Sequence, residues 1–418
     1  MKAVIDILNV DKLPNGLTIY TIPKHGFHKT FAILTTNYGS LDLRFKQNGD
    51  WVDTPKGVAH FLEHLMFNTV DGNALTKLST NGASANAYTS TNVTAYYFEC
   101  VDKFSENLEI LLDFVSTAYF TDENVETERG IIEQEVLMGE DDPDHALYYG
   151  LMESLFQTNP LRYPIAGTVD SINLITADTL HKCHNVFYNP ANMVLCIAGD
   201  VDPSEIRKIA ERILPSTCEK ISARDIGLEE ELTPVRFHHT KAMDVSLPIF
   251  LAGCKTTPPS RGLESLRYNL ISAIALDFIS GHSSQLYFNL YNEGLVSSDF
   301  SSSFDFTHNA AYSFFGGETR DPNRVFEAIK DEITRLSKGS LDLSYFNRIK
   351  KAALGSYVRS LNSFESCCHN IIDGHLHDYD SFEIPNVLSD INENDIISFY
   401  RNCLTPENMA ISIISPRG

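Results

Sequence analysis

The 418-residue sequence has no long run of apolar residues, no cysteines spaced C-x-x-C and comparatively few basic side chains. Because a membrane-spanning helix needs about 20 consecutive apolar residues, the sequence predicts no membrane partner. The eight cysteines are scattered, which disfavours a disulfide framework and a cysteine-ligated zinc site. Residues 1–11 show no charged-then-apolar targeting pattern. We therefore expect a cytoplasmic protein.

The shortage of basic residues leaves a strongly acidic chain. Its 33 Lys and Arg stand against 55 Asp and Glu, which gives a formal net charge of −22. Nucleic acids and anionic membranes bind Lys/Arg patches, so neither is expected as a partner. Peptides, small molecules and proteins remain open. If acidic side chains line a binding chamber, basic unfolded peptides would be preferred, and salt would weaken that preference.

The first half of the chain mixes strands and helices without regular alternation, which is typical of an α+β fold. A helix is expected to begin at Thr54-Pro55, because a cap residue precedes a proline there. The Thr/Tyr-rich segment 83–101 predicts a hairpin. Further strands are expected at 17–22, 31–36 and 194–198, and further helices at 74–80, 104–118, 122–138, 145–156, 177–187 and 203–213.

The second half repeats this plan after a polar, acidic stretch. Strands are expected at 246–252 and 409–414, a hairpin at 300–316, and helices at 265–278, 285–292, 325–336 and 344–361. The repetition predicts two similar α+β domains, residues 1–214 and 235–418, joined by the linker 215–234. Two unrelated α+β domains are the alternative.

The clearest chemical signal is the motif H-x-x-E-H formed by residues 60–64. A helix places His60 and His64 one turn apart on the same face, with Glu63 beside them. The apolar residues of this segment fall on the opposite face. Neutral imidazoles suit Zn²⁺, and a catalytic zinc usually has three protein ligands. A solvated surface is the ordinary alternative, but composition gives only about 0.03 chance matches to the motif.

A third ligand is sought on the predicted helix 122–138. Val125 and Ile132 lie on its core face, while Glu128 and Glu135, seven residues apart, stack along one flank of that face. Glu133 lies on the other flank. Any single surface glutamate is usually solvated. Two that border the core are better placed to reach a shared site.

These residues resemble a known family. H-x-x-E-H, followed about 70 residues later by the run ERGIIEQE at 128–135, is similar to the pitrilysin, or M16, zinc metallopeptidases. That family includes insulin-degrading enzyme and the mitochondrial processing peptidases. The resemblance spans nearly the whole chain, is strongest to the bacterial YmfH-like branch, and extends to residues 57–64, 82–89, 141–144, 165–168 and 189–193. It implies a duplicated α+β sandwich of the LuxS and processing-peptidase type, forming one half of a clamshell.

The resemblance also implies roles for individual residues. One Zn²⁺ per chain would be bound by His60, His64 and Glu135. Glu128 would orient a ligand, and Glu63 would be the general base on a zinc-bound water. The strand edge Asn86, Ala87 and Tyr88 would pair with an extended peptide substrate.

The chain departs from the family pattern in its second half. Members carry an arginine and, seven residues later, a tyrosine that reach the substrate. Here Tyr291 replaces the arginine, and Ser297 or Ser298 stands at the tyrosine position. We therefore expect a homo- or heterodimer in which an M16 homologue supplies the missing pair. The expected function is a zinc-dependent endopeptidase acting in a clamshell chamber. The alternative is a zinc-containing peptide-binding or regulatory subunit with little activity alone.

Overall fold

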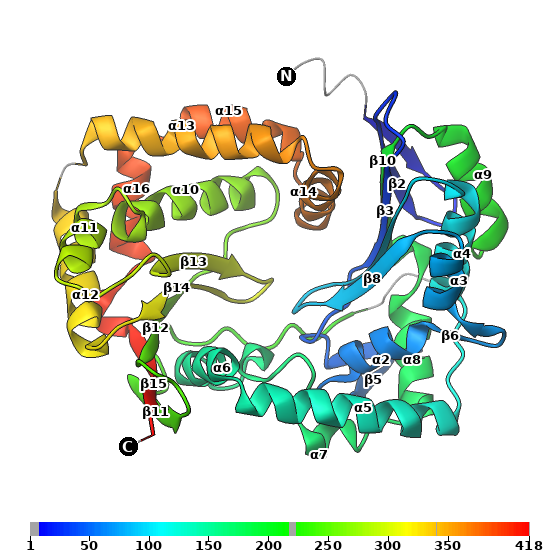
Figure 1. Cartoon of the computed structure of the whole chain (residues 1–418), viewed down its shortest axis with the longest axis horizontal. Helices are drawn as coiled ribbons and strands as arrows, with labels where there is room; N and C mark the ends of the chain where they lie inside the picture. The colour runs from blue at the N-terminus through cyan, green and yellow to red at the C-terminus, as the bar shows by residue number, and fades with distance from the viewer. Residues whose placement is uncertain (1–7, 217–222, 340, 418) are drawn as a thin grey trace.

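The computed structural model describes residues 8–216, 223–339 and 341–417. Residues 1–7, part of the segment 1–11 in which no targeting pattern was expected, lie outside the described part. Residues 217–222 of the expected linker lie outside it as well. The two halves of the chain form an arch, each half built around its own sheet (Figure 1). Within the described ranges, no helix combines the length and apolar character that a membrane crossing requires.

The first sheet has six strands in the order β1-β2-β10-β3-β9-β8. Residues 30–36 form a strand that is buried along its whole length, because helices cover both faces of the sheet there. The strand bounds are β1 (Asn9–Lys12), β2 (Thr18–Pro23), β3 (Thr30–Thr36), β8 (Ser84–Thr89), β9 (Thr94–Cys100) and β10 (Met193–Gly199). β8 therefore forms one open edge of this sheet.

The second sheet has five strands in the order β11-β15-β12-β14-β13. Apart from β1, the first sheet has the strands β2, β3, β8, β9 and β10, and the second has β11 to β15. Taken in chain order within each half, both sets lie side by side in the same order, and in both the first strand pairs in parallel with the last. The predicted duplication of an α+β fold is thereby confirmed. The bounds are β11 (His238–Met243), β12 (Ile249–Thr256), β13 (Ser301–Phe306), β14 (Ala311–Glu318) and β15 (Ala410–Pro416).

The helices agree with most of the predicted segments. In the first half they are α2 (Val58–Met66), α3 (Ala74–Thr80), α4 (Phe104–Ser116), α5 (Asp122–Asp141), α6 (Pro143–Leu155), α7 (Val169–Ile172), α8 (Ala177–Phe187) and α9 (Pro203–Ile213). In the second half they are α10 (Leu263–Ser280), α11 (Gln285–Asn292), α12 (Pro322–Lys338), α13 (Leu343–Ser360), α14 (Phe364–His377), α15 (Ile384–Asp390) and α16 (Glu393–Asn402).

Several elements were not predicted from the sequence. These include helices α7, α14, α15 and α16, the edge strands β1 and β11, and two small hairpins, β4 (Arg44–Gln47) with β5 (Asp50–Asp53) and β6 (Asn68–Thr69) with β7 (Gly72–Asn73). The small hairpins are too short for an alternating pattern to reveal them.

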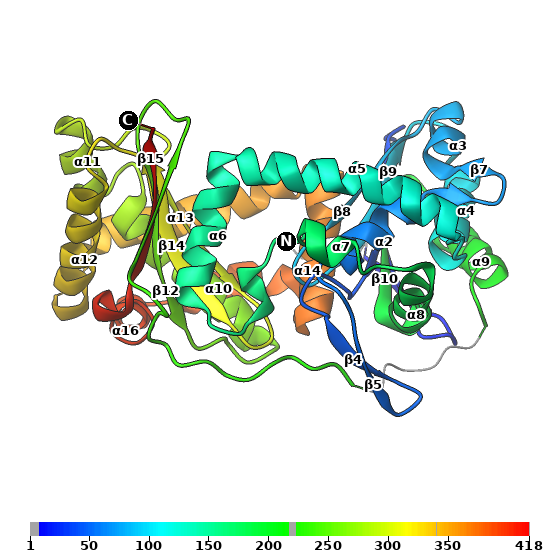
Figure 2. The same ribbon diagram turned by 90° about the horizontal axis from the view of Figure 1, so that it is seen from below.

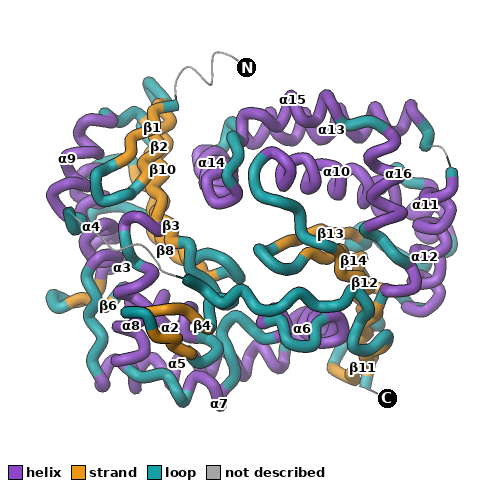
Figure 3. Tube along the Cα trace, turned by 180° about the vertical axis from the view of Figure 1, so that it is seen from behind, coloured by secondary structure: helices purple, strands orange, loops and turns teal. Residues whose placement is uncertain are grey.

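Each half covers one face of the other half's sheet. Helix α14, from the second half, packs its Phe364 and Cys368 against Phe31 and Ile33 of the first sheet. Helix α6, from the first half, packs against β15, β12 and β11 of the second sheet (Figures 1 and 3). The two sheets thus complete their burial by exchanging helices.

The described part of the linker is anchored to the first half. Residues 223–225 pair with β4, whose hairpin projects beside the linker in Figure 2. The Arg224 guanidinium donates to Asp42 at 3.1 Å and to the Asn192 side-chain oxygen at 2.8 Å. The Glu230 carboxylate accepts hydrogen bonds from three successive backbone amides, those of residues 157–159. This segment is therefore held in place by specific contacts.

Gly150 allows α6 to lie directly on the second sheet. A Cβ atom at this position would lie 2.2 Å from His239 Nδ1 and 2.6 Å from Ser412 Oγ. Gly150→Ala is therefore expected to lower the free energy of unfolding by about 1–3 kcal/mol. Gly355→Ala, in helix α13 with open space around it, is the control and should be neutral or stabilising by about 0.5–1 kcal/mol. Urea unfolding of both variants measures this difference, and equal effects would contradict it.

Candidate metal centre

The helix with the two histidines begins later than the sequence suggested. The predicted start at Thr54-Pro55 is wrong, because the Thr54 amide and hydroxyl both donate to the Leu43 carbonyl. The Lys56 carbonyl accepts a bond from the Ser171 hydroxyl at 2.9 Å. Gly57 then adopts φ of +87°, outside the helical region, and caps α2. The contact of Lys56 with Ser171 docks the segment before α2 against α7.

Helix α2 buries the face that its periodicity predicts. Its apolar side chains belong to the hydrophobic core between the first sheet and the helices of the first half, called the first core below. They are Val58, Phe61, Leu62, Leu65 and Met66. His60 and His64 are half-buried on the opposite side. Glu63 is only 8% exposed, which is far from the solvated position of an ordinary surface glutamate.

Helix α5 supplies the carboxylates. Thr121 caps it and forms a capping box with Asn124, and Val125 and Ile132 lie in the first core as predicted. Because its core face is fixed against α2, the flank of α5 that carries Glu128 and Glu135 faces the two histidines.

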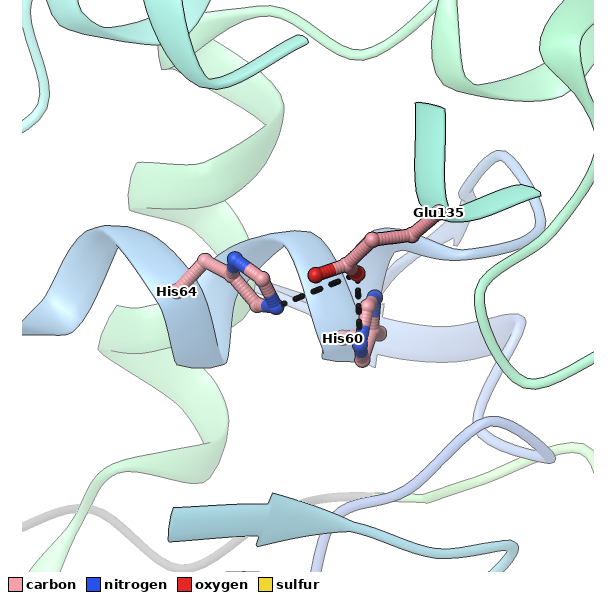
Figure 4. Close-up of side chains that lie close together, drawn as sticks. All are labelled: His60, His64 and Glu135. Atoms are coloured by element: carbon pink, nitrogen blue, oxygen red, sulfur yellow. Dashed lines mark ion pairs between the residues drawn. The ribbon is translucent and has the colours of Figure 1, made fainter. Parts of the chain in front are cut away.

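The side chains of His60, His64 and Glu135 converge (Figure 4). Glu135 Oε2 lies 3.7 Å from His60 Nε2 and 3.6 Å from His64 Nε2, and one ligand atom from each residue lies within 4.8 Å of the others. Two ligands bound about 2.1 Å from a tetrahedral zinc would be about 3.4 Å apart. The two imidazoles and one carboxylate therefore suit a zinc ion in both chemistry and spacing.

The histidines differ in their surroundings. Burial, together with the neighbouring His64, lowers the pKa of His60 to about 4, so its ring is neutral at pH 7. Burial also opposes a charge on His64, but the Glu128 hydrogen bond and the nearby Glu135 and Glu63 outweigh it, and the pKa of His64 is raised. Glu128 Oε1 lies 3.0 Å from His64 Nδ1. This contact holds the His64 ring so that Nε2 faces Glu135.

Glu63 belongs to the site without joining the three converging ligands. The Thr89 hydroxyl donates to its Oε2 at 2.7 Å. Burial raises the pKa of the Glu63 carboxyl, and the Thr89 hydrogen bond only partly offsets that effect. The sequence pattern could not reveal Thr89, because nothing local links a residue of β8 to a residue of α2.

The strand edge beside the site is open. Among the described residues β8 pairs with β9 alone, and the Ala87 amide donates to the Asn86 side-chain oxygen at 2.9 Å. Since backbone groups alternate in direction along an antiparallel strand, those of Ala85, Ala87 and Thr89 face the open edge. β8, which carries the predicted residues Asn86, Ala87 and Tyr88, packs against α2, and of these three only Ala87 turns its backbone groups to the open edge.

Two other predicted features lie farther from the cluster. The Tyr88 side chain turns to the opposite face of the sheet, where its hydroxyl lies 3.4 Å from His369 Nδ1 of α14. Tyr291 lies on α11 in the second half of the arch, away from α2 (Figure 1), and is 54% exposed. The chain itself does not bring Tyr291 to the cluster.

The contact between Glu128 and His64 predicts a measurable effect on metal affinity. Glu128→Gln is expected to weaken zinc binding by about 10- to 100-fold, because an amide oxygen holds the imidazole N–H less firmly than a carboxylate does. Glu133→Gln, on the other flank of α5, is the control and should leave affinity unchanged. Competition with a chromophoric chelator measures both. Equal affinities of Glu128→Gln and wild type would exclude this role for Glu128.

Comparisons with known proteins show the family of the chain. Residues 47–169 match the family model of insulinase, peptidase family M16, and residues 174–353 match that of the peptidase M16 inactive domain. The chain is 36% identical over 416 residues to the zinc protease YmfH of Bacillus subtilis, covering 97% of this chain and 96% of that protein.

Solved structures show the same fold. An M16-like peptidase from Alicyclobacillus acidocaldarius superposes with a TM-score of 0.95 and 32% identity, covering 98% of each chain. Pitrilysin superposes with a TM-score of 0.76 at 17% identity, covering 98% of this chain but 45% of its own. The family models, the identity to YmfH and the shared fold together place the chain in peptidase family M16.

Proposed function

We propose that this chain is a zinc-dependent endopeptidase that holds one zinc ion through His60, His64 and Glu135. The observation that carries the proposal is the convergence of these three side chains beside a buried carboxyl group, Glu63. A bound zinc ion would supply Lewis acidity toward water and toward a peptide carbonyl oxygen.

The protein's own groups carry the proton and set the geometry. Glu63 acts as general base: it takes the proton of the attacking water and returns it to the nitrogen of the cleaved peptide bond. Burial raises the pKa of the Glu63 carboxyl, which makes the carboxylate a stronger base toward the water proton. Glu128 keeps the His64 ring in the ligand orientation through the 3.0 Å contact.

The substrate is an extended polypeptide segment. The open edge of β8 offers backbone donors and acceptors at Ala85, Ala87 and Thr89, and an extended chain pairs with such an edge whatever its sequence. Of the predicted residues Asn86, Ala87 and Tyr88, Ala87 would pair with the peptide, and the other two flank it on the same strand. The net charge of −22 supports a preference for basic peptides.

We further propose that the working form is a homo- or heterodimer with an M16 homologue. The chain matches 45% of the length of pitrilysin, as expected of half of a closed chamber. Tyr291 belongs to α11, which lies away from α2 in Figure 1, and this supports a partner that contributes the missing arginine and tyrosine. The position of α11 away from α2 also favours the alternative, a zinc-containing regulatory subunit.

The seven described cysteines are free thiols, which supports a cytoplasmic location.

Replacing the general base tests the peptidase function. Glu63→Gln should retain zinc, since Glu63 is not among the three converging ligands, and should lower the cleavage rate by at least about 100-fold. The measurement combines metal analysis with cleavage of a pool of basic, neutral and acidic peptides. At low salt, the basic peptides should be cut fastest by the wild type. A zinc-loaded Glu63→Gln protein with wild-type activity would contradict the assignment.

The dimer proposal predicts how activity depends on a partner. The purified chain alone is expected to cleave the peptide pool slowly, and addition of a co-purified homologue should raise the rate. Analytical ultracentrifugation reports whether a homodimer or a heterodimer forms. Full activity of a protein that sediments as a monomer would refute this proposal.

A further inference from the structure

The hydrogen bond between Thr89 and Glu63 joins two parts of the site that otherwise have separate roles. Thr89 is the last residue of β8, the strand with the open edge, and Glu63 lies on the metal-binding helix α2. The side chains of Ala85 and Ala87 face the first core, as alternation along the strand requires of Thr89 as well. The Thr89 side chain therefore points toward α2, while its backbone groups face the open edge.

The proton of the Thr89 hydroxyl is directed at Glu63 by its neighbours. Thr94 Oγ1 lies 3.4 Å from Thr89 Oγ1, and the Thr94 hydroxyl donates its hydrogen bond to the Tyr38 carbonyl oxygen at 3.0 Å. Thr94 can then only accept from Thr89, and the contact of Thr89 with Glu63 Oε2, at 2.7 Å, is much the shorter of the two. An ionised carboxylate can only accept hydrogen bonds. The arrangement fixes Oε2 and leaves Glu63 Oε1 for proton transfer.

We propose that Thr89 is a positioning residue that holds the general base Glu63 in one orientation and couples it to peptide binding. The proposal rests on the peptidase function proposed above. A peptide paired with the β8 edge contacts the backbone of the residue whose side chain orients the base. Thr89 thus sets both the pairing of the substrate with β8 and the orientation of the Glu63 carboxylate.

This role separates catalysis from substrate and metal binding. The backbone of residue 89 offers the same edge to a peptide whatever its side chain, so the KM is expected to change little. Thr89 is not among the three converging residues, so the zinc content is expected to stay at the wild-type level. Loss of the hydroxyl frees the Glu63 carboxylate to turn, and a misplacement of about 1 Å can cost about 100-fold in rate.

Four variants test the proposal, with the partner present wherever wild-type activity needs it. Thr89→Val keeps the shape and strand preference of threonine but lacks the hydroxyl, and its kcat should fall about 10- to 100-fold at unchanged KM and zinc content. Thr89→Ser keeps the hydroxyl and should retain at least about half of kcat. Thr240→Val is the matched control, an exposed threonine on the edge strand β11, and should behave as wild type. Thr89→Ala replaces Thr89→Val if the latter does not fold.

A readout independent of activity comes from crystals of the metal-free variants. The Glu63 carboxylate should leave its wild-type position in Thr89→Val and keep it in Thr89→Ser and Thr240→Val. An unchanged Glu63 or an unchanged kcat in Thr89→Val would overturn the inference. An equal loss in Thr89→Ser would also overturn it, since the hydroxyl would not matter. No cleavage by the wild-type complex would overturn the proposed function and this inference together, whereas cleavage by wild type and Thr89→Val alike overturns the inference alone.

Discussion

Two imidazoles from one helix and a carboxylate from another can share a metal ion only while the two helices keep a fixed spacing. Here α2 and α5 pack directly against each other, and the start of α2 also closely approaches the loop before α7. The two backbone segments each bend there at a glycine with positive φ, namely Gly57 and Gly167. A Cβ on Gly57 would lie 2.4 Å from the Ala166 carbonyl oxygen, and one on Gly167 would lie 2.6 Å from that of Lys56. No side chain fits between these two backbones, and their contact holds the start of α2 in place.

The same fixed geometry concentrates negative charge. Glu63, Glu128 and Glu135 all lie around two imidazoles, and Glu63 is among the most buried acidic side chains of the first half. Without a cation these carboxylates repel one another, and this repulsion lowers the free energy of unfolding of the first half. A divalent ion would balance that charge. The open edge of β8 shows a similar compromise, because exposed edges favour unwanted association and are usually covered.

Local sequence patterns predicted the elements of this fold better than their contacts. The spacing of His60 and His64, and the core face of α5 with Glu128 and Glu135 beside it, follow from helical periodicity alone. The true start of α2 could not be predicted, because Thr54 is bonded to Leu43 and the Lys56 carbonyl to Ser171. The contact of Thr89 with Glu63, and the packing of α14 on the first sheet, likewise depend on partners that are distant in the chain.

The exchange of α6 and α14 also bears on the order in which the chain is made. Helix α6 leaves the ribosome before any strand of the sheet that it covers, so the second sheet forms with its cover already present. The first sheet is in the opposite position: its last strand ends at Gly199, whereas α14 begins only at Phe364. Until then Phe31, Ile33 and Cys196 remain on an uncovered apolar face. During synthesis, the nascent first half therefore presents a surface for chaperones, and it completes its fold only after most of the second half has emerged.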